Sequence, residues 1–533
     1  MKKQHTIHSI PLVITITIFS IIINLLIFII PLLVNKIVNR ELEITAPVIM
    51  GILLVMMIQI LLQLVLILLQ NRCMKKYKIR CCTNLYQKIF SMRYDKLIGS
   101  GTTYLVQRAD AAALTLAQLS IKALPILISK SLIVLIILVY SIRINVLLFA
   151  IMAGMTIANI WGFFVLNKKL AEKSVYMQNH IPKEREDIYQ IAAQVDFLKQ
   201  NADNTVINPI LERHLEKIEE INKQVNTVAN GGSSIIDFFN MFLENMVLIV
   251  LTYLFIIGKN GMGDILTITA VMAYFVPAIM SIVSVNLDMR ELKASKEFIR
   301  FLDENKEEDG TVQIEGIENI EVDAEQLGVD GAGCLLHNVK LRAEKGDVVG
   351  IIGESGTGKS TLLKNLLKYW KSAGIKVNGI PLETIENQSY RQHISYYSQN
   401  PVIITGTVGD NLNFGRVQDK DDFERFSFLK KFQDEETGWS REILENGNNL
   451  SGGDKQKISL ARMMTDTADV LLLDEPTSSL DSDTEEQILD ELFAESQGRI
   501  VILVTHRPSN LKYCNKIYKI TDGSLQQTTL TRV

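Results

Sequence analysis

The stretch that decides the fold is Gly353-Glu354-Ser355-Gly356-Thr357-Gly358-Lys359-Ser360-Thr361. It fits the phosphate-loop pattern, in which two glycines flank four residues and are followed by Lys and then Ser or Thr. The apolar run at 348–352 precedes the loop and predicts a strand, and residues 362–369 follow it with the pattern of a helix. Because the motif requires this strand–loop–helix context, the sequence predicts a nucleoside triphosphate site.

The residue types of this loop suit a polyphosphate. Glycines let backbone N–H groups approach phosphate oxygens closely, and the N-terminus of the following helix favours anions. Lys359 brings a positive charge to the outer phosphates, and Ser360 offers its hydroxyl to Mg²⁺. We therefore expect residues 353–361 to bind ATP together with Mg²⁺.

A second apolar run, at 470–473, ends in the acidic pair Asp474-Glu475. Acidic residues at such strand ends hold Mg²⁺ beside a phosphate loop, so Asp474 is a predicted metal ligand. Glu475 is then placed to polarise the attacking water as a general base. With the phosphate loop, this pair predicts nucleotide hydrolysis.

Composition separates the chain into two halves. Of the 533 residues, 47% are hydrophobic, which is close to the average for soluble proteins. The first half nevertheless holds long Ile/Leu/Val runs, whereas the second half has the composition of a soluble domain. The net charge of −4 and the lack of a basic block argue against a nucleic-acid partner. The cysteines fit no metal or redox spacing and are expected to be reduced thiols: Cys73, Cys81, Cys82, Cys334 and Cys514.

Six segments of the first half are long and apolar enough to cross a bilayer as helices, which takes about 20 residues. The first of them exceeds the hydrophobic region of a signal peptide and lacks a small-residue cleavage site, so we expect it to remain as a span. The predicted spans are about 10–34, 47–70, 123–142, 144–166, 235–257 and 265–285.

Lys and Arg set the expected orientation. They gather at the N-terminus and after the second, fourth and sixth spans, and are sparse on the opposite side. Both termini are therefore expected in the cytoplasm, with the protein multi-pass in the cytoplasmic membrane and among its lipids. The long charged links 71–122 and 167–234 are then expected to be helical extensions on the cytoplasmic side.

Polar residues inside the spans are candidates for a substrate cavity. Asp237, Asn240 and Glu244 recur at helical spacing on one face of the fifth span. A central carboxylate costs about 2.5–3.5 kcal/mol, so this face should turn away from lipid. The functional interpretation is that this face lines a cavity; the alternatives are a polar lock between helices or a neutral Glu244. Weaker instances are Gln59 and Gln63 in the second span and Lys130 in the third.

The second half has the pattern of an α/β domain. Short buried apolar runs alternate with helical segments, which predicts a largely parallel core sheet. A charged stretch within 301–317 indicates a linker. We therefore expect an all-α domain of six membrane helices at 1–300, this linker, and an α/β phosphate-loop ATPase cassette at 318–533.

The segment Asn449-Leu450-Ser451-Gly452-Gly453-Asp454-Lys455-Gln456 resembles the signature loop of ATP-binding cassette (ABC) transporters. Other segments of the family appear in the family's order. They are Ser398-Gln399-Asn400-Pro401, Glu445-Asn446-Gly447, Ser478-Ser479-Leu480-Asp481 and Thr505-His506-Arg507. The resemblance implies that Gln399 touches Mg²⁺, that His506 is the switch histidine, and that Ser451, Gly452 and Gly453 bind the γ-phosphate.

Six spans fused to one cassette resemble an exporter-type half-transporter, in which each ATP lies between the phosphate loop of one cassette and the signature of the other. A second half-transporter is therefore expected as partner. Both half-sites look complete, which favours a homodimer, although a heterodimer stays open. In this family ATP joins the cassettes, and the closure switches the cavity between the two sides of the membrane.

Three features depart from the family. No Phe, Tyr or Trp occurs between Phe301 and Tyr369, where the family stacks adenine on an aromatic ring, so we expect weak discrimination between ATP and GTP. Asp454 stands where glutamine is usual, with Lys455 as a neighbour that could offset its charge. The chain ends soon after 517–521, so the usual C-terminal helical tail is expected to be largely missing.

The sequence thus predicts ATP-driven export, catalysed through Lys359, Glu475 and His506. The acidic face of the fifth span favours a cationic or amphipathic cargo, such as a small bacteriocin-like peptide. No cysteine-protease domain precedes the first span, so any peptide leader is expected to be removed elsewhere. A lipid flippase, a multidrug exporter and an ATP-gated or sensing membrane protein are the alternatives. The six spans argue against a soluble nucleic-acid ATPase, and the fusion argues against an importer.

Overall fold

The computed structural model describes residues 10–200, 204–329, 333–371, 373–414, 421–434 and 437–528. The chain divides into two compact units. The N-terminal unit comprises Met1–Met92 and Lys96–Lys306, and the C-terminal unit comprises Arg93–Asp95 and Glu307–Val533. Each unit has its own hydrophobic core and is described by itself.

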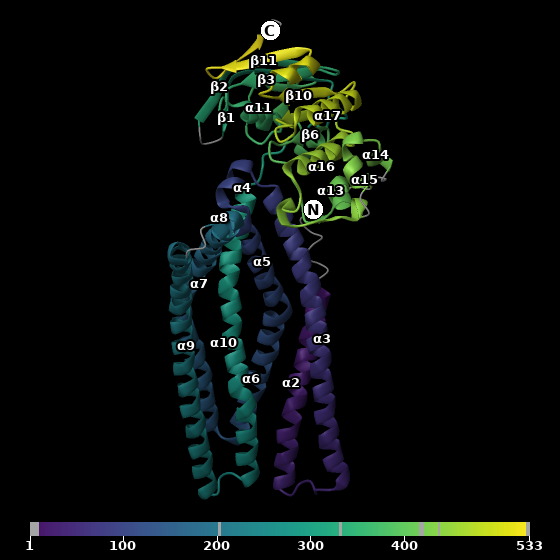
Figure 1. The fold of residues 1–533 in the computed structure, drawn as a ribbon. Coiled ribbons are helices and arrows are strands. Elements are labelled where there is room, and N and C mark those ends of the chain that lie inside the picture. Colours follow the sequence, from purple (N-terminus) through teal and green to yellow (C-terminus); the bar gives the residue numbers. More distant parts are fainter. Residues whose placement is uncertain are drawn as a thin grey trace. The chain divides into compact units, whose positions relative to one another are not determined.

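The N-terminal unit is all helical (Figure 1). Six of its described helical segments are long and apolar enough to cross a membrane, as predicted. Several helices continue far beyond their apolar windows. The helices are α2 (Ile10–Val38), α3 (Ala46–Phe90), α4 (Tyr94–Ser100), α5 (Thr102–Gln118), the π-helical turn η1 (Leu119–Ala123), α6 (Leu124–Ile144), α7 (Val146–Ala192), α8 (Val195–Gln200), α9 (Asn204–Ile256) and α10 (Met262–Glu304).

The core of the N-terminal unit forms where α6, α7, α9 and α10 meet. Ile137, Met152, Leu251 and Phe275, one from each helix, are fully buried there. By contrast, only 6% of the most apolar window of α3 is buried within the chain. Its Leu, Ile and Met side chains therefore need lipid or a second chain around them, because in water α3 would expose a large apolar surface.

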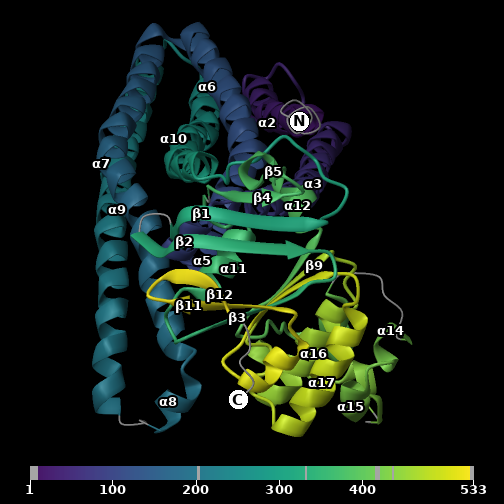
Figure 2. The same cartoon turned by 90° about the horizontal axis from the view of Figure 1, so that it is seen from above.

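The C-terminal unit is built on a ten-stranded mixed sheet with the order β5-β4-β1-β2-β12-β11-β3-β10-β9-β6 (Figure 2). A second sheet pairs β7 with β8. The strands are β1 (Asn319–Val329), β2 (Gly333–Glu344), β3 (Val348–Gly353), β4 (Ile375–Val377), β5 (Ile380–Pro381), β6 (Ile394–Tyr397), β7 (Gly406–Thr407), β8 (Glu442–Ile443), β9 (Val470–Asp474), β10 (Ile500–Val504), β11 (Lys516–Thr521) and β12 (Ser524–Thr528).

The parallel part of this sheet runs through β11, β3, β10, β9 and β6 and is covered on both faces. Along β9, Val470 and Leu472 enter one core cluster, whereas Leu471 and Leu473 enter the other. Successive side chains of a strand point to opposite faces, so burial on both faces makes the run continuously apolar. This is the pattern from which the strand was predicted.

The antiparallel part of the sheet was not anticipated. β1 pairs with β2 and with β4 in antiparallel register. On β1, Ile320, Val322 and Ala324 are buried and alternate with exposed residues, because only one face of this strand lies on the core. The sheet is therefore mixed, and its parallel core lies at one end of the strand order.

Seven α-helices and five short 3₁₀ helices accompany the strands in the described part of the C-terminal unit. The α-helices are α11 (Lys359–Leu366), α12 (Asn387–Arg391), α13 (Val408–Asn413), α14 (Asp421–Glu424), α15 (Lys430–Asp434), α16 (Gly452–Met464) and α17 (Ser482–Glu495). The 3₁₀ turns are η2 (Leu382–Thr384), η3 (Ser427–Leu429), η4 (Gly438–Ser440), η5 (Glu445–Gly447) and η6 (Pro508–Tyr513).

Candidate functional site

The phosphate loop connects β3 to α11. Gly356 and Gly358 have φ values of 81° and 99°, a left-handed conformation that favours glycine. A Cβ on Gly358 would lie 3.0 Å from Leu336 of β2, so the loop is also packed tightly there. Both constraints explain why this turn needs glycines, and they direct the loop's N–H groups and the start of α11 to one point.

Lys359 is buried at this point, and its ammonium group rests on the loop itself. Its Nζ donates hydrogen bonds to the carbonyl oxygens of Gly353 at 2.9 Å and of Glu354 at 2.7 Å. Burial lowers the pKa of Lys359, and the nearby carboxylates of Glu475 and Asp474 oppose that shift. The lysine is thus a desolvated cation held among oxygen atoms, which suits it to a phosphate group.

The predicted catalytic carboxylate, Glu475, lies between two of the predicted partners. Its Oε1 is 2.7 Å from Nε2 of His506, and its Oε2 accepts a hydrogen bond from Nε2 of Gln399 at 3.2 Å. β9, β10 and β6 are neighbouring parallel strands, so their carboxyl ends bring these three residues to one edge of the sheet. The two contacts fix the direction of the carboxylate.

The backbone of Glu475 is strained. Its φ of 50° is unusual for a residue with a side chain, and its N–H donates to the carbonyl oxygen of Val504 at 3.0 Å. Such strain costs of order 1–3 kcal/mol and persists where the surrounding structure imposes it, commonly at functional sites. Here it turns the carboxylate out of β9 towards His506.

The donor set beside the loop fits a hard divalent cation. Ser360 hydrogen bonds to the Asp474 carboxylate, and burial, together with the neighbouring Glu475 charge, raises the pKa of Asp474 against that hydrogen bond. A buried carboxylate with a raised pKa gains from a cation, and Mg²⁺ prefers hydroxyl, carboxylate and carbonyl oxygens. Ser360 and Asp474 would hold it directly or through water, with the amide oxygen of Gln399 near by.

The signature segment 449–456 forms the start of α16. Ser451 caps this helix, because its hydroxyl accepts a hydrogen bond from the N–H of Asp454 at 3.1 Å. Gly452 and Gly453 follow as the first residues of the helix and pack against the loop around Ser479. Among the described residues, no hydrogen bond or ion pair joins 451–453 to the phosphate loop of the same chain.

Asp454, the unusual residue of the signature, is paired with a residue that the sequence did not single out. Its Oδ2 lies 2.8 Å from Nζ of Lys431 on α15, whereas Lys455 donates instead to the carbonyl oxygen of Asn446. Burial raises the pKa of Asp454, but the hydrogen bonds from Lys431 and Ser451 outweigh it and hold the pKa below its usual value. The lysine that pairs with this carboxylate is therefore Lys431, and not the neighbouring Lys455.

Gln456 ties the signature helix to the segment 478–481. Its side chain is buried, donates to Oγ of Ser478 at 3.1 Å and accepts from the N–H of Ser479 at 3.1 Å. The NH₂ group and the carbonyl oxygen of this side-chain amide are thereby both engaged. The start of α16 and the segment 478–481 are therefore joined by two hydrogen bonds.

A second polar cluster, centred on the buried Glu485, lies between Thr477 and Arg507. Glu485 accepts a hydrogen bond from Oγ1 of Thr477 at 2.5 Å and from Nδ2 of Asn510 at 2.8 Å, and it pairs with Arg507. Arg507 follows His506 directly in the chain. Sequence reasoning missed Glu485, because its partners lie 8 to 25 residues away along the chain.

The three polar residues of the fifth span, Asp237, Asn240 and Glu244, differ in burial. Asn240 is buried, and it exchanges hydrogen bonds of 2.6 and 3.1 Å with Asn159 of α7. Glu244 is half-buried, and Asp237 is exposed in the single chain. Asn240 thus makes the polar contact between helices that was one of the two interpretations.

We expect Asn240→Leu to lower the free energy of unfolding by about 0.6–1.7 kcal/mol, the range measured for polar contacts between membrane helices. The amide of Asn159 would lose its partner in an apolar setting. Denaturant unfolding in detergent would measure the loss. Asn245→Leu, at an exposed position of the same helix, is the matched control. The double change Asn159→Leu/Asn240→Leu should recover part of the loss, and an Asn240→Leu effect no larger than the control would contradict the lock.

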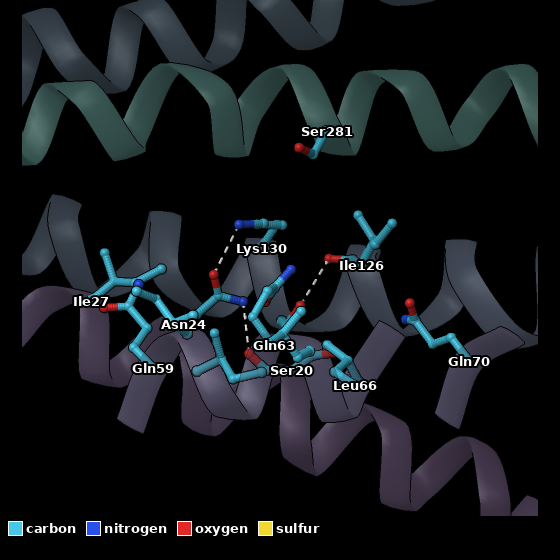
Figure 3. Close-up of a pocket in the computed structure, with 14 residues that line it drawn as sticks. Ser20, Asn24, Ile27, Gln59, Gln63, Leu66, Gln70, Ile126, Lys130 and Ser281 are labelled. Atoms are coloured by element: carbon cyan, nitrogen blue, oxygen red, sulfur yellow. Dashed lines mark hydrogen bonds between the residues drawn. The ribbon is translucent and has the colours of Figure 1, made fainter. Parts of the chain in front are cut away.

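The weaker polar candidates do come together. Gln59 and Gln63 of α3 and Lys130 of α6 line one cavity of the N-terminal unit (Figure 3). The sequence did not show that these residues line one cavity, because Lys130 lies in a different span from the two glutamines.

Comparison with known proteins identifies the C-terminal unit. Residues 336–478 match the family model described as ABC transporter. The chain therefore carries the nucleotide-binding domain of that family, and the matched range includes the phosphate loop, Gln399, the signature and Glu475.

Curated relatives extend the likeness into the N-terminal unit. A sublancin-168-processing and transport ATP-binding protein of Bacillus subtilis is 27% identical over 64% of this chain and 51% of its own length. An ATP-dependent lipid A-core flippase of Colwellia psychrerythraea is 30% identical over 59% of this chain and 57% of its own. The chain spans about half the length of such relatives.

A solved structure of a bacterial Atm1-family ABC exporter with ATP bound superposes with a TM-score of 0.79. The match covers 98% of this chain and 96% of that one at 17% sequence identity, so it shows the fold alone. The predicted fold, a six-helix membrane domain of the exporter type followed by an ATPase cassette, is confirmed.

Proposed function

Because this chain joins an ABC transporter cassette to the membrane domain of an exporter-type half-transporter, we propose that it is an ATP-driven exporter that works as a dimer. The observation that carries the proposal is the contact of Glu475 with both His506 and Gln399, next to the phosphate loop. A cassette that only sensed nucleotide would not need a carboxylate oriented from two sides. Residues 301–317 link the membrane domain at 1–300 to the cassette at 318–533.

In this proposal the chain's own groups divide the work of hydrolysis. Lys359 leaves the carbonyl oxygens of the loop and binds the outer phosphates, as the N–H groups of 353–361 do. Ser360, Asp474 and Gln399 hold Mg²⁺, which neutralises phosphate charge when bound. Glu475 accepts a proton from the attacking water, and His506 keeps the carboxylate in place.

The second half-site comes from a partner chain. Among the described residues, Ser451, Gly452 and Gly453 make no hydrogen bond or ion pair with the phosphate loop of their own chain. A second copy would place its signature over the nucleotide. The membrane spans would then switch from inward- to outward-facing as the cassettes close.

We propose a peptide or another amphipathic molecule as cargo, exported across the cytoplasmic membrane with both termini on the cytoplasmic side. Two relatives support this choice by name: one is a sublancin-168-processing and transport protein, and the other is a flippase of lipid A-core, which is an amphipathic molecule. A cationic cargo has less support, because Asn240 of the predicted acidic face is engaged in a contact between helices.

Purified protein in lipid nanodiscs tests the core of this proposal. With Mg-ATP we expect a dimer by light scattering and release of phosphate, and Glu475→Gln should keep the dimer while stopping the release. Protein that stays monomeric with Mg-ATP, or that releases no phosphate with Lys359 and Glu475 intact, would contradict it.

Nucleotide choice provides a separate prediction. No aromatic residue occurs between Phe301 and Tyr369, so adenine lacks the ring on which a base usually stacks for about 1–3 kcal/mol. We expect kcat/KM for ATP and GTP to differ by well under the tenfold that 1.4 kcal/mol would give. Steady-state phosphate release with each nucleotide measures this, and a strong preference for ATP would show that another group recognises the base.

A further inference from the structure

A cavity of about 520 Å³ lies in the N-terminal unit, among α2, α3, α6 and α10 (Figure 3). Its lining combines a few apolar residues with an unusual number of polar side chains. The polar residues are Ser20, Asn24, Gln59, Gln63, Gln70, Ser129, Lys130 and Ser281. All of them come from helices that cross or enter the apolar part of the unit, where polar groups need a reason to be present.

Three glutamines form a stripe along α3. Gln59, Gln63 and Gln70 are separated by 4 and 7 residues, and at 3.6 residues per turn they lie on one face of the helix. The stripe is about 16 Å long at 1.5 Å per residue. Within the part of the chain that the structure describes, none of these amides has a hydrogen-bond partner, although each offers donors and an acceptor.

Lys130 is the one charged side chain among the lining residues. Its Nζ donates to Oδ1 of Asn24 at 2.9 Å, and no carboxylate of the described chain pairs with it. Asn24 donates in turn from Nδ2 to the carbonyl oxygen of Ser20 at 2.8 Å, which holds its oxygen towards the lysine. A cation at membrane depth usually pairs with an anion, and here a neutral amide only positions it.

We propose that this cavity binds an extended peptide segment, with a peptide carboxylate at Lys130 and the peptide backbone along the stripe of Gln59, Gln63 and Gln70. The single positive charge of Lys130 balances the single negative charge of one carboxylate. Glutamine side chains carry both a donor and an acceptor, which matches the N–H and C=O groups of a peptide backbone. At about 3.3–3.6 Å per extended residue, the stripe accommodates about five residues.

A lipid phosphate is a poorer match for the same lining. The phosphate of a lipid presents only acceptor oxygens, and a headgroup offers few donors for three glutamine oxygens. A phosphomonoester also carries close to two negative charges, which a single lysine does not balance. The proposal rests on the proposed export function and narrows its cargo to peptides with an accessible carboxylate.

Two peptides that differ in one group test the proposal directly. The probe is N-dansyl-Leu-Ala-Leu-Ala-Leu-Ala, prepared as the free acid and as the C-terminal amide. Fluorescence anisotropy would measure binding to the full chain in phosphatidylcholine nanodiscs without nucleotide. We expect the acid to bind at least ~10-fold more tightly than the amide, because a charge-assisted hydrogen bond is lost in the amide.

Variants of the cavity separate charge from packing. Lys130→Met should bring the affinity for the acid down to that for the amide, and Lys130→Arg should keep the preference. Gln63→Leu should weaken both peptides alike. Lys122→Met changes an exposed lysine of the neighbouring turn that does not line the cavity, and it should keep the wild-type preference. If Lys130→Met does not fold, the affinities for the acid and for the amide can still be compared on wild type, Lys130→Arg and Gln63→Leu. That comparison still tests the proposal.

Three results would overturn the proposal: equal binding of acid and amide to wild type, a preference for the acid that survives in Lys130→Met, or no binding of either peptide. Displacement of the acid by dioleoyl phosphatidic acid, lost in Lys130→Met, would assign the cavity to a lipid phosphate instead. Because the assay contains no nucleotide, a chain that binds the acid but releases no phosphate from ATP would refute only the proposed export function.

Discussion

Replacing Glu475 with Gln is expected to lower the rate of ATP hydrolysis by about 10²–10⁴-fold, the usual contribution of a general base. The substitution keeps the size of the side chain and its hydrogen bond to Gln399 or His506, but it removes the proton acceptor. Nucleotide binding should therefore persist, and ATP should accumulate in a stable dimer. Phosphate release and filter-bound radiolabelled ATP measure the two quantities separately.

Glu486→Gln is the matched control for this experiment. Glu486 is an exposed carboxylate of α17 that pairs with Lys512 at the surface, and it has no contact with the described nucleotide site. Its variant should hydrolyse ATP as the wild type does. If Glu475→Gln retained a rate within about tenfold of wild type, far less than a lost base should cost, another group would have to accept the proton.

Replacing Lys359 with Met is expected to weaken ATP binding itself by about 10–150-fold, which corresponds to the 1.5–3 kcal/mol of a hydrogen bond to a charged group. The ammonium group is buried and already desolvated, so the phosphates gain its charge without removing it from bulk water. Titration of a fluorescent ATP analogue would measure the dissociation constant. Hydrolysis should fall in proportion at low ATP.

Lys376→Met provides the control for charge alone, because Lys376 is an exposed lysine of β4 in the same unit. Its variant should bind the analogue as the wild type does. Unchanged binding by Lys359→Met would mean that the loop's N–H groups alone hold the phosphates. With the Glu475 variant, this pair separates binding from turnover: one variant should bind without hydrolysing, and the other should barely bind.

Local chain chemistry explains why the nucleotide site could be predicted. The phosphate loop depends on glycine dihedral angles and on a strand and a helix that adjoin it in sequence. Asp474 and Glu475 follow the apolar run of β9, which is buried on both faces. The continuous apolar run therefore indicates where the acidic pair lies. His506 and Gln399 were assigned by resemblance, and their approach to Glu475 follows from neighbouring parallel strands.

Side chains paired across long stretches of chain could not be predicted in this way. Lys455 was named as the neighbour that could offset the charge of Asp454. The residue that pairs with Asp454 is Lys431, which lies 23 positions away on another helix. Asn240 was one member of an expected acidic face, but its partner Asn159 is 81 positions away. Which helix faces which depends on packing of whole helices, and helical spacing states only which residues share a face.

The sequence by itself determined that this protein has six helices long and apolar enough to cross a membrane, a phosphate loop, and an acidic pair at the end of a buried strand. Each of these features depends on adjacent residues or on a repeating period. Only the tertiary structure decided that Gln59, Gln63 and Lys130 line one cavity, that Asn240 locks two helices together, and that the first strands pair antiparallel. These features arise where elements far apart in the chain pack together, and the shape of that packing is a property of the folded chain as a whole.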